Sequence, residues 1–262
     1  MTTFPCFNTD FDFVNMPAVA DVQDIIDQFR TTALAQTPAW TEPVAETFKS
    51  PVDGVGRFYT ITMSAIAVDR LQWLVKDQNG ITIADRTIDI DNPGPTSVNL
   101  YIGTYHGYVE SMRATPEIAA SGILDETPLA QNAIDNYVYG NGYRNSGGAV
   151  DGQGGTTNYF SMLDNGAAAY NHRFRSVAQT PAGAIGLKDA AGNPQFFPCD
   201  TQANVGGIAA WIGRQYQGYI CDSSLVFDSQ HDIKIGDAGE EGTFRVINYA
   251  SQTGMRQMLR VA

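Results

Sequence analysis

The sequence has few cationic side chains, and this scarcity argues against a nucleic-acid partner. Sixteen Lys and Arg residues stand against 28 Asp and Glu residues in 262 positions, so the formal net charge is -12. Lysine occurs at four positions, which are Lys49, Lys76, Lys188 and Lys234. Neutralising phosphates requires clustered Lys and Arg, which this chain does not offer. We therefore expect no nucleic acid among its partners.

Long apolar runs are also missing from the sequence. No run reaches the roughly 18 apolar residues that a membrane-spanning helix needs. The first six residues, MTTFPC, lack the charged and apolar regions of a secretory signal. We therefore expect no membrane partner and synthesis in a cytoplasm, where Cys6, Cys199 and Cys221 would remain reduced thiols.

Signatures of catalysis, cofactor binding and metal binding are absent as well. The histidines His106, His172 and His231 form neither a His-Glu-x-x-His pattern nor a pair four residues apart. The three cysteines are too scattered for a metal knuckle, and neither a Gly-x-Ser-x-Gly elbow nor a phosphate-binding loop occurs. We expect no catalytic residue, no cofactor and no metal, with His106 and His172 as polar strand or interface positions.

Two carboxylates come nearest to a catalytic arrangement. Asp89 and Asp91 alternate with isoleucines and follow Thr87, so in a strand they would share one face, about 7 Å apart. That separation is compatible with an inverting glycosidase, and with Asn92 the pair could also ligate calcium, although the spacing matches no EF-hand loop. The favoured interpretation is the polar side of a half-exposed strand.

One amphipathic helix is predicted near the start of the chain. Asp21 can cap its first turn, and Pro38 ends the pattern, which gives a helix over residues 21–36. Its apolar stripe consists of Val22, Ile25, Ile26, Phe29 and Ala33. We favour packing of this stripe on its own domain over docking onto a neighbouring subunit.

From residue 58 onward the pattern changes to short β-rich runs separated by turn residues, which indicates antiparallel strands. The runs at 71–75 and 81–83 predict a hairpin about Asn79 and Gly80. Seven glycines between residues 140 and 155 indicate a connector over residues 126–156 rather than an element interior.

The second half of the chain echoes the first at a constant offset of 112 positions. The matching positions are Phe48 with Phe160, Asp53-Gly54 with Asn165-Gly166, Lys76-Asp77 with Lys188-Asp189, and Gly80 with Gly192. The aromatic runs 101–109 and 211–220 follow in the same order. Coincidence between Gly-rich and aromatic-rich turns is the alternative explanation.

The fold prediction is therefore all-β, with two tandem, diverged β-sandwich or barrel-like modules and an N-terminal helical arm. The arm and helix would span residues 1–40 and the first module residues 41–125. The Gly-rich connector would span residues 126–156 and the second module residues 157–262.

Tyrosines and a tryptophan gather near the ends of the two repeats and in the connector. They are Tyr101, Tyr105, Tyr108, Tyr137, Tyr139, Tyr143, Trp211, Tyr216 and Tyr219. Tyrosine combines apolar area with a hydroxyl group, so such residues suit protein interfaces and sugar platforms. A place in the core or at a subunit interface is favoured over sugar binding.

Several short phrases of the sequence resemble those of virion structural proteins of tailed bacteriophages. They are Trp40-Thr41-Glu42-Pro43, Phe48-Lys49-Ser50-Pro51-Val52-Asp53, Asp77-Gln78-Asn79-Gly80, Gly122-Ile123-Leu124-Asp125 and Tyr137-Val138-Tyr139-Gly140. The resemblance extends over most of the chain and implies a non-enzymatic part of a head decoration, neck, collar or tail. It carries over no catalytic residue, and it implies a protein made in the host cytoplasm and located in the virion.

A duplicated chain suits a symmetric particle, because three copies present six similar modules to a six-fold site. We therefore expect a homo-oligomer, with a trimer or hexamer favoured, that contacts other virion proteins. Two other classes stay open: a glycan-binding β module and a glycan-cleaving enzyme that uses Asp89 or Asp91.

Overall fold

The computed structural model describes the chain from residue 11 to residue 261 with gaps, and its side chains mainly up to residue 140. The described ranges are 11–90, 96–112, 117–126, 134–140, 158–164, 167–176, 197–205, 208–222, 232–235, 242–246 and 255–261.

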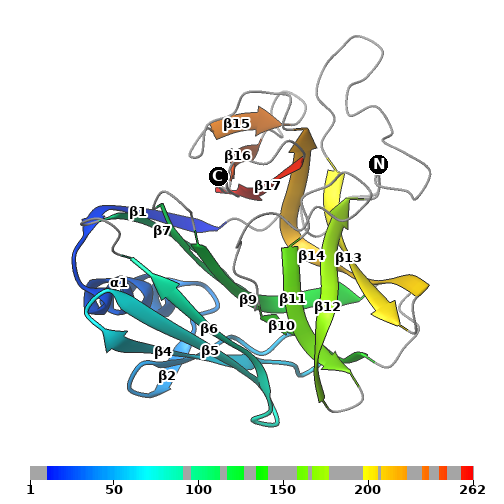
Figure 1. Ribbon diagram of the computed structural model, residues 1–262, viewed down its shortest axis with the longest axis horizontal. Helices are drawn as coiled ribbons and strands as arrows, with labels where there is room; N and C mark the ends of the chain where they lie inside the picture. Colours follow the sequence, from blue (N-terminus) through cyan, green and yellow to red (C-terminus); the bar gives the residue numbers. More distant parts are fainter. Residues whose placement is uncertain are drawn as a thin grey trace.

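Within these ranges the chain forms one helix and a long series of strands (Figure 1). The elements in chain order are β1 (Asp12–Val19), α1 (Val22–Ala35), β2 (Thr41–Val44), β3 (Thr47–Lys49), β4 (Tyr59–Ala67), β5 (Arg70–Asp77), β6 (Thr82–Asp89), β7 (Thr96–Gly103), β8 (His106–Ser111), β9 (Glu117–Glu126), β10 (Ile134–Gly140), β11 (Asn158–Asp164), β12 (Ala167–Ser176), β13 (Phe197–Val205), β14 (Ile208–Asp222), β15 (Asp232–Ile235), β16 (Gly242–Val246) and β17 (Met255–Arg260).

The strands form two antiparallel sheets. The small sheet has the order β2-β3-β4-β5-β6, and the large sheet has the order β1-β7-β8-β9-β10-β11-β12-β13-β14-β17-β16-β15. An additional pairing between β9 and β14 joins distant parts of the large sheet, with Gly213 opposite Glu126 and Arg214 opposite Asp125. The prediction of an antiparallel all-β chain is confirmed.

Helix α1 forms where the sequence predicts it. The Asp21 side chain accepts a hydrogen bond of 2.9 Å from the Gln23 backbone N–H and so satisfies one of the free donors of the first turn. All five residues of the predicted stripe are buried. Figure 1 shows the helix between β1 and β7 on one side and the small sheet on the other. The stripe therefore packs within its own chain.

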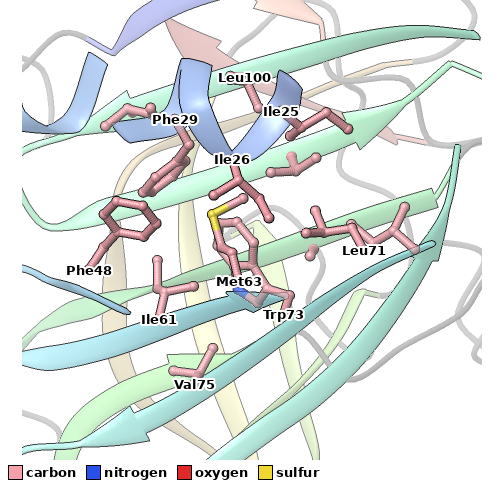
Figure 2. Close-up of a cluster of buried hydrophobic side chains, with 14 of the residues drawn as sticks. Ile25, Ile26, Phe29, Phe48, Ile61, Met63, Leu71, Trp73, Val75 and Leu100 are labelled. Carbon is pink, nitrogen blue, oxygen red and sulfur yellow. The ribbon is translucent and has the colours of Figure 1, made fainter. Parts of the chain in front are cut away.

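The hydrophobic core lies among α1, the small sheet and one face of β7 to β9. In Figure 2, Phe29 of the helix reaches the aromatic and sulfur-containing side chains of the small sheet. Its ring centroid lies 5.6 Å from that of Trp73 in an edge-on contact and 5.0 Å from that of Phe48. Trp40 adds an anchor, because its indole N–H donates to the carbonyl oxygen of Gly103 across 3.1 Å.

The predicted hairpin about Asn79 and Gly80 is formed by β5 and β6. Gly80 has a φ of +79°, a conformation that glycine adopts without steric cost. The Asp77 carboxylate accepts hydrogen bonds from the backbone N–H groups of Asn79 and Ile81, at 3.0 and 2.7 Å. The turn is therefore fixed by one buried side chain as well as by the glycine.

The strands of residues 41–125 are shared between the two sheets, because β2 to β6 form the small sheet and β7 to β9 belong to the large one. Strand β10 lies inside the range 126–156 and pairs with β9 and β11. Most of the glycine cluster in that range lies outside the described residues. The division into two modules stays a prediction.

Candidate functional site

Strand β6 is the edge of the small sheet and ends at Asp89, one of the two carboxylates that the sequence places nearest to a catalytic arrangement. Asp85 and Thr87 are exposed and Asp89 is half-buried, whereas Ile88 is buried. The expected alternation around Asp89 is therefore present. Its proposed companions Asp91 and Asn92 lie outside the described residues.

One residue of β6 departs from the apolar series on the inward side of the strand. Ala84, Ile88 and Ile90 are buried at alternate positions, and Arg86 occupies the position between the first two of them. Arg86 is only 7% exposed. A charged residue at a buried position of a sheet is uncommon unless it is paired.

Glu117, the first residue of β9, supplies the opposite charge. It is 4% exposed, and its Oε2 lies 3.9 Å from Nη2 of Arg86. The same oxygen accepts a hydrogen bond of 3.1 Å from the backbone N–H of Asp89. The Glu117 carboxylate therefore contacts the backbone of Asp89, and this contact links the edge of the small sheet to the large sheet.

A pocket of about 330 Å³ opens at this junction. The described residues that line it are Ile66, Arg70, Asp85, Arg86, Thr87, Asp89 and Glu117. They come from the end of β4, from the start of β5, from β6 and from the start of β9. Two guanidinium groups and three carboxylates therefore share one small concave surface.

The outer wall of this pocket is fixed by hydrogen bonds between β5 and β6. Arg70 and Asp89 are register partners, and Nε of Arg70 donates to Oδ1 of Asp89 across 3.0 Å. The Gln72 amide donates to Oδ1 of Asp85 across 2.9 Å. The charged groups of the wall thus have partners within the protein.

A second polar cluster lies on the face of the large sheet that points away from α1. His106 is buried, and its Nδ1 lies 3.1 Å from the hydroxyl of Tyr139, which lies 2.9 Å from the hydroxyl of Tyr108. Burial lowers the pKa of His106 to about 3, because the charged imidazolium would lose its hydration. His106 is therefore a neutral, hydrogen-bonded core residue.

The same face buries a carboxylate. Glu110 is 1% exposed, and its Oε2 accepts from the Asn99 amide at 3.1 Å and from the Tyr101 hydroxyl at 3.3 Å. Asn15 of β1 extends this network by donating to Asn99 across 2.8 Å. Arg245 of β16 lies over the Phe13 ring, 3.7 Å from its centroid. Glu110, Asn99 and Tyr101 of this network are buried, whereas Asn15 at its end is exposed.

The remaining predicted positions are placed as follows. Tyr101, Tyr108 and Tyr139 are core residues and Tyr105 is half-buried, which agrees with the favoured interpretation for these four. The side chains of the other five aromatic residues of the cluster lie outside the described part of the structure, and they are Tyr137, Tyr143, Trp211, Tyr216 and Tyr219. The backbones of Cys199, Cys221 and His172 lie in β13, β14 and β12, and Cys6 and His231 fall outside the described residues. Among the described side chains, no group of three or more His, Cys, Asp or Glu residues is placed to hold a metal ion.

The helix α1 is too short and too polar to cross a membrane, and no other helix is found in the part of the chain that the structure describes.

Comparison with protein-family models and with curated proteins gives no match to this chain. Function is therefore inferred from the residues and their geometry.

Proposed function

We propose that the chain is a non-enzymatic structural subunit of a tailed-bacteriophage virion, which assembles as a symmetric homo-oligomer and contacts other virion proteins. The class of protein, a virion structural component, is proposed from the resemblance of short stretches of its sequence to such proteins. The few charged residues and the antiparallel sheets are compatible with a part that works by assembly rather than by turnover.

The observation that carries the proposal is a concentration of exposed aliphatic side chains on one part of the chain. Seven large hydrophobic residues are exposed among the described side chains, and five of them fall between residues 44 and 68. They are Val44, Val52, Val55, Ile66 and Val68, with exposed fractions of 52 to 69%. Single exposed apolar residues are ordinary, but exposed aliphatic residues on β2, on β4 and in the loops on either side of β4 offer apolar surface to another protein.

The proposed duplication suggests a symmetry for the contact between subunits. We infer that residues 157–262 repeat the module of residues 41–125, so that three chains provide six related modules to a six-fold or pseudo-six-fold site in a head, neck or tail. Helix α1, which lies within the N-terminal arm, packs on the sheets of its own chain. A trimer or a hexamer is the assembly that this arrangement favours.

The location of the protein in particles tests the proposal. Phage particles from cells that carry the gene are purified on a density gradient and probed with an antibody against this chain. We expect the chain to band with intact particles at a copy number that is a multiple of three. Its presence only in the soluble lysate, with none in washed particles, would contradict the virion role.

A further inference from the structure

We propose that the pocket between β6 and the start of β9 binds a neutral polyhydroxylated ligand, a single sugar unit of a glycan. This activity goes beyond the structural role proposed above and does not depend on it. Four properties of the site carry the inference: a buried charged pair, charged groups that already have partners within the protein, an exposed rim and a small volume.

The buried pair is the first property. Arg86 and Glu117 are buried at a junction where the neighbouring inward positions Ala84 and Ile88 are apolar. Desolvating two charges costs free energy, and apolar residues of similar volume often stabilise such a site equally well or better. The stability of the fold alone therefore does not explain why a guanidinium and a carboxylate occupy these buried positions. Binding of a ligand that contacts both groups would explain it.

The pairing of the charged groups limits the class of ligand. Arg70 is bonded to Asp89, Arg86 lies beside Glu117, and the Asp85 carboxylate accepts from the neutral Gln72 amide, so the described charged groups of the pocket carry one excess negative charge. An ionic ligand would have to compete with these internal partners. A hydroxyl group is both donor and acceptor, so neighbouring hydroxyls can donate to a carboxylate and accept from a guanidinium while the existing pairs persist.

The rim and the size of the pocket fit one sugar ring. Asp85 and Thr87 are exposed on the outward side of β6 and can reach a ligand from solvent. Ile66, which is 52% exposed, offers apolar surface to the C–H groups of a ring. The volume of about 330 Å³ lies at the small end of ligand pockets, which hold about 300–1,000 Å³.

Ligand-observed NMR with the full chain tests the proposal. The probes are the methyl glycosides of glucose, galactose, mannose and N-acetylglucosamine at millimolar concentration. We expect saturable binding of at least one of them. The variants Asp85→Asn and Thr87→Val each remove pocket hydrogen-bonding capacity from an exposed position, and we expect each to weaken binding about tenfold. Glu117→Gln tests the buried floor in the same way, after thermal unfolding has shown that the variant is folded.

The control is Glu46→Gln, which removes one half-buried carboxylate charge in the turn between β2 and β3, at the opposite edge of the small sheet. Its affinity for the bound glycoside should equal that of the unmodified chain. The proposal is overturned if none of the four glycosides binds saturably, or if Asp85→Asn and Thr87→Val bind as tightly as the control. Binding of inorganic phosphate or calcium ion at this pocket in place of the glycosides, lost in the same variants, would also overturn it.

Discussion

At the residue scale, the described part of the molecule is organised by polar side chains placed among apolar ones. Asp77 fixes a turn, His106 and Glu110 are hydrogen-bonded beneath the large sheet, and Arg86 is buried beside Glu117. Each of these groups loses hydration on folding, and its partner offsets that cost. Removing a partner should therefore cost more than removing an exposed charge.

The first prediction concerns His106. Its pKa falls from 6.5 when unfolded to about 3 when folded, so between these values the unfolded chain binds a proton that the folded chain excludes. Stability is complete above pH 6.5 and decreases as the pH falls toward 3. By linkage the loss at pH 4.5 is on the order of 2–3 kcal/mol.

Urea unfolding at pH 7 and pH 4.5 measures this effect when the unmodified chain is compared with His106→Gln. The variant is expected to lose less stability between the two pH values, even though its stability at pH 7 is lower. The carboxylates that titrate in this range are common to both proteins. Equal losses would show that His106 is not the responsible group.

The second prediction concerns the turn at Asp77. Asp77→Ala removes the acceptor for the N–H groups of Asn79 and Ile81, and we expect a loss of about 1–2 kcal/mol in the free energy of unfolding. Asp77→Asn keeps an acceptor oxygen and should recover a large part of that loss. If chemical denaturation gives the same stability for both variants, the turn does not depend on these bonds.

At the element scale, the structure also shows which parts of the fold a sequence can predict. Helix α1 and the β5–β6 hairpin follow from local periodicity, a capping Asp and a turn glycine, and both form as expected. Strand β1 was not predicted, because its register partners in β7 lie 77 to 90 residues further along the chain. Local patterns do not encode such pairings.

In the candidate site, too, local features of the sequence could be predicted and contacts between distant residues could not. Alternation placed Asp89 on the outward side of its strand, but Glu117 reaches it only through the packing of β9 against the small sheet. The one local signal that could have identified the pocket is Arg86, a charged residue within the inward apolar series of β6. The role of His106 depends on Tyr139, 33 positions away.

The third prediction tests the packing of α1. Phe29 is fully buried between Trp40, Phe48 and Trp73, so Phe29→Ala should destabilise the protein by about 3–5 kcal/mol through lost burial and a cavity. Leu34 on the same helix is 40% exposed, and Leu34→Ala should cost less than about 1 kcal/mol. Thermal unfolding measures the stability of both variants. Equal losses of stability in Phe29→Ala and Leu34→Ala would contradict this placement of the helix.

The fourth prediction tests the packing of β10 on the small sheet. A Cβ atom at Gly140 would lie 2.5 Å from Cβ of Ala84 and 3.2 Å from Cγ2 of Val75. Gly140→Ala should therefore cost about 1–3 kcal/mol by overpacking. A Cβ at Gly54 meets no atom within 4 Å, so Gly54→Ala serves as the control and should be neutral or slightly stabilising. Equal stability of the two variants in urea would argue against contact between β10 and β5–β6.

At the scale of the whole molecule, the acidic charge of the chain and its exposed apolar side chains act in opposite directions on assembly. A net charge of -12 keeps separate copies apart, while exposed aliphatic side chains between residues 44 and 68 favour contact. Added salt screens the repulsion between copies and leaves the apolar contact, so assembly should be stronger at higher ionic strength.

The native mass of the purified chain, measured by light scattering over a concentration series at low and high salt, tests the proposed assembly. We expect a trimer or a hexamer that becomes more populated as concentration and salt increase. The variant Val55→Asp should shift the equilibrium toward smaller species. Leu34→Asp adds the same charge at an exposed position of α1, outside residues 44–68, and should leave the equilibrium unchanged. A monomer at every concentration and salt, with no binding to purified phage particles, would contradict the claim.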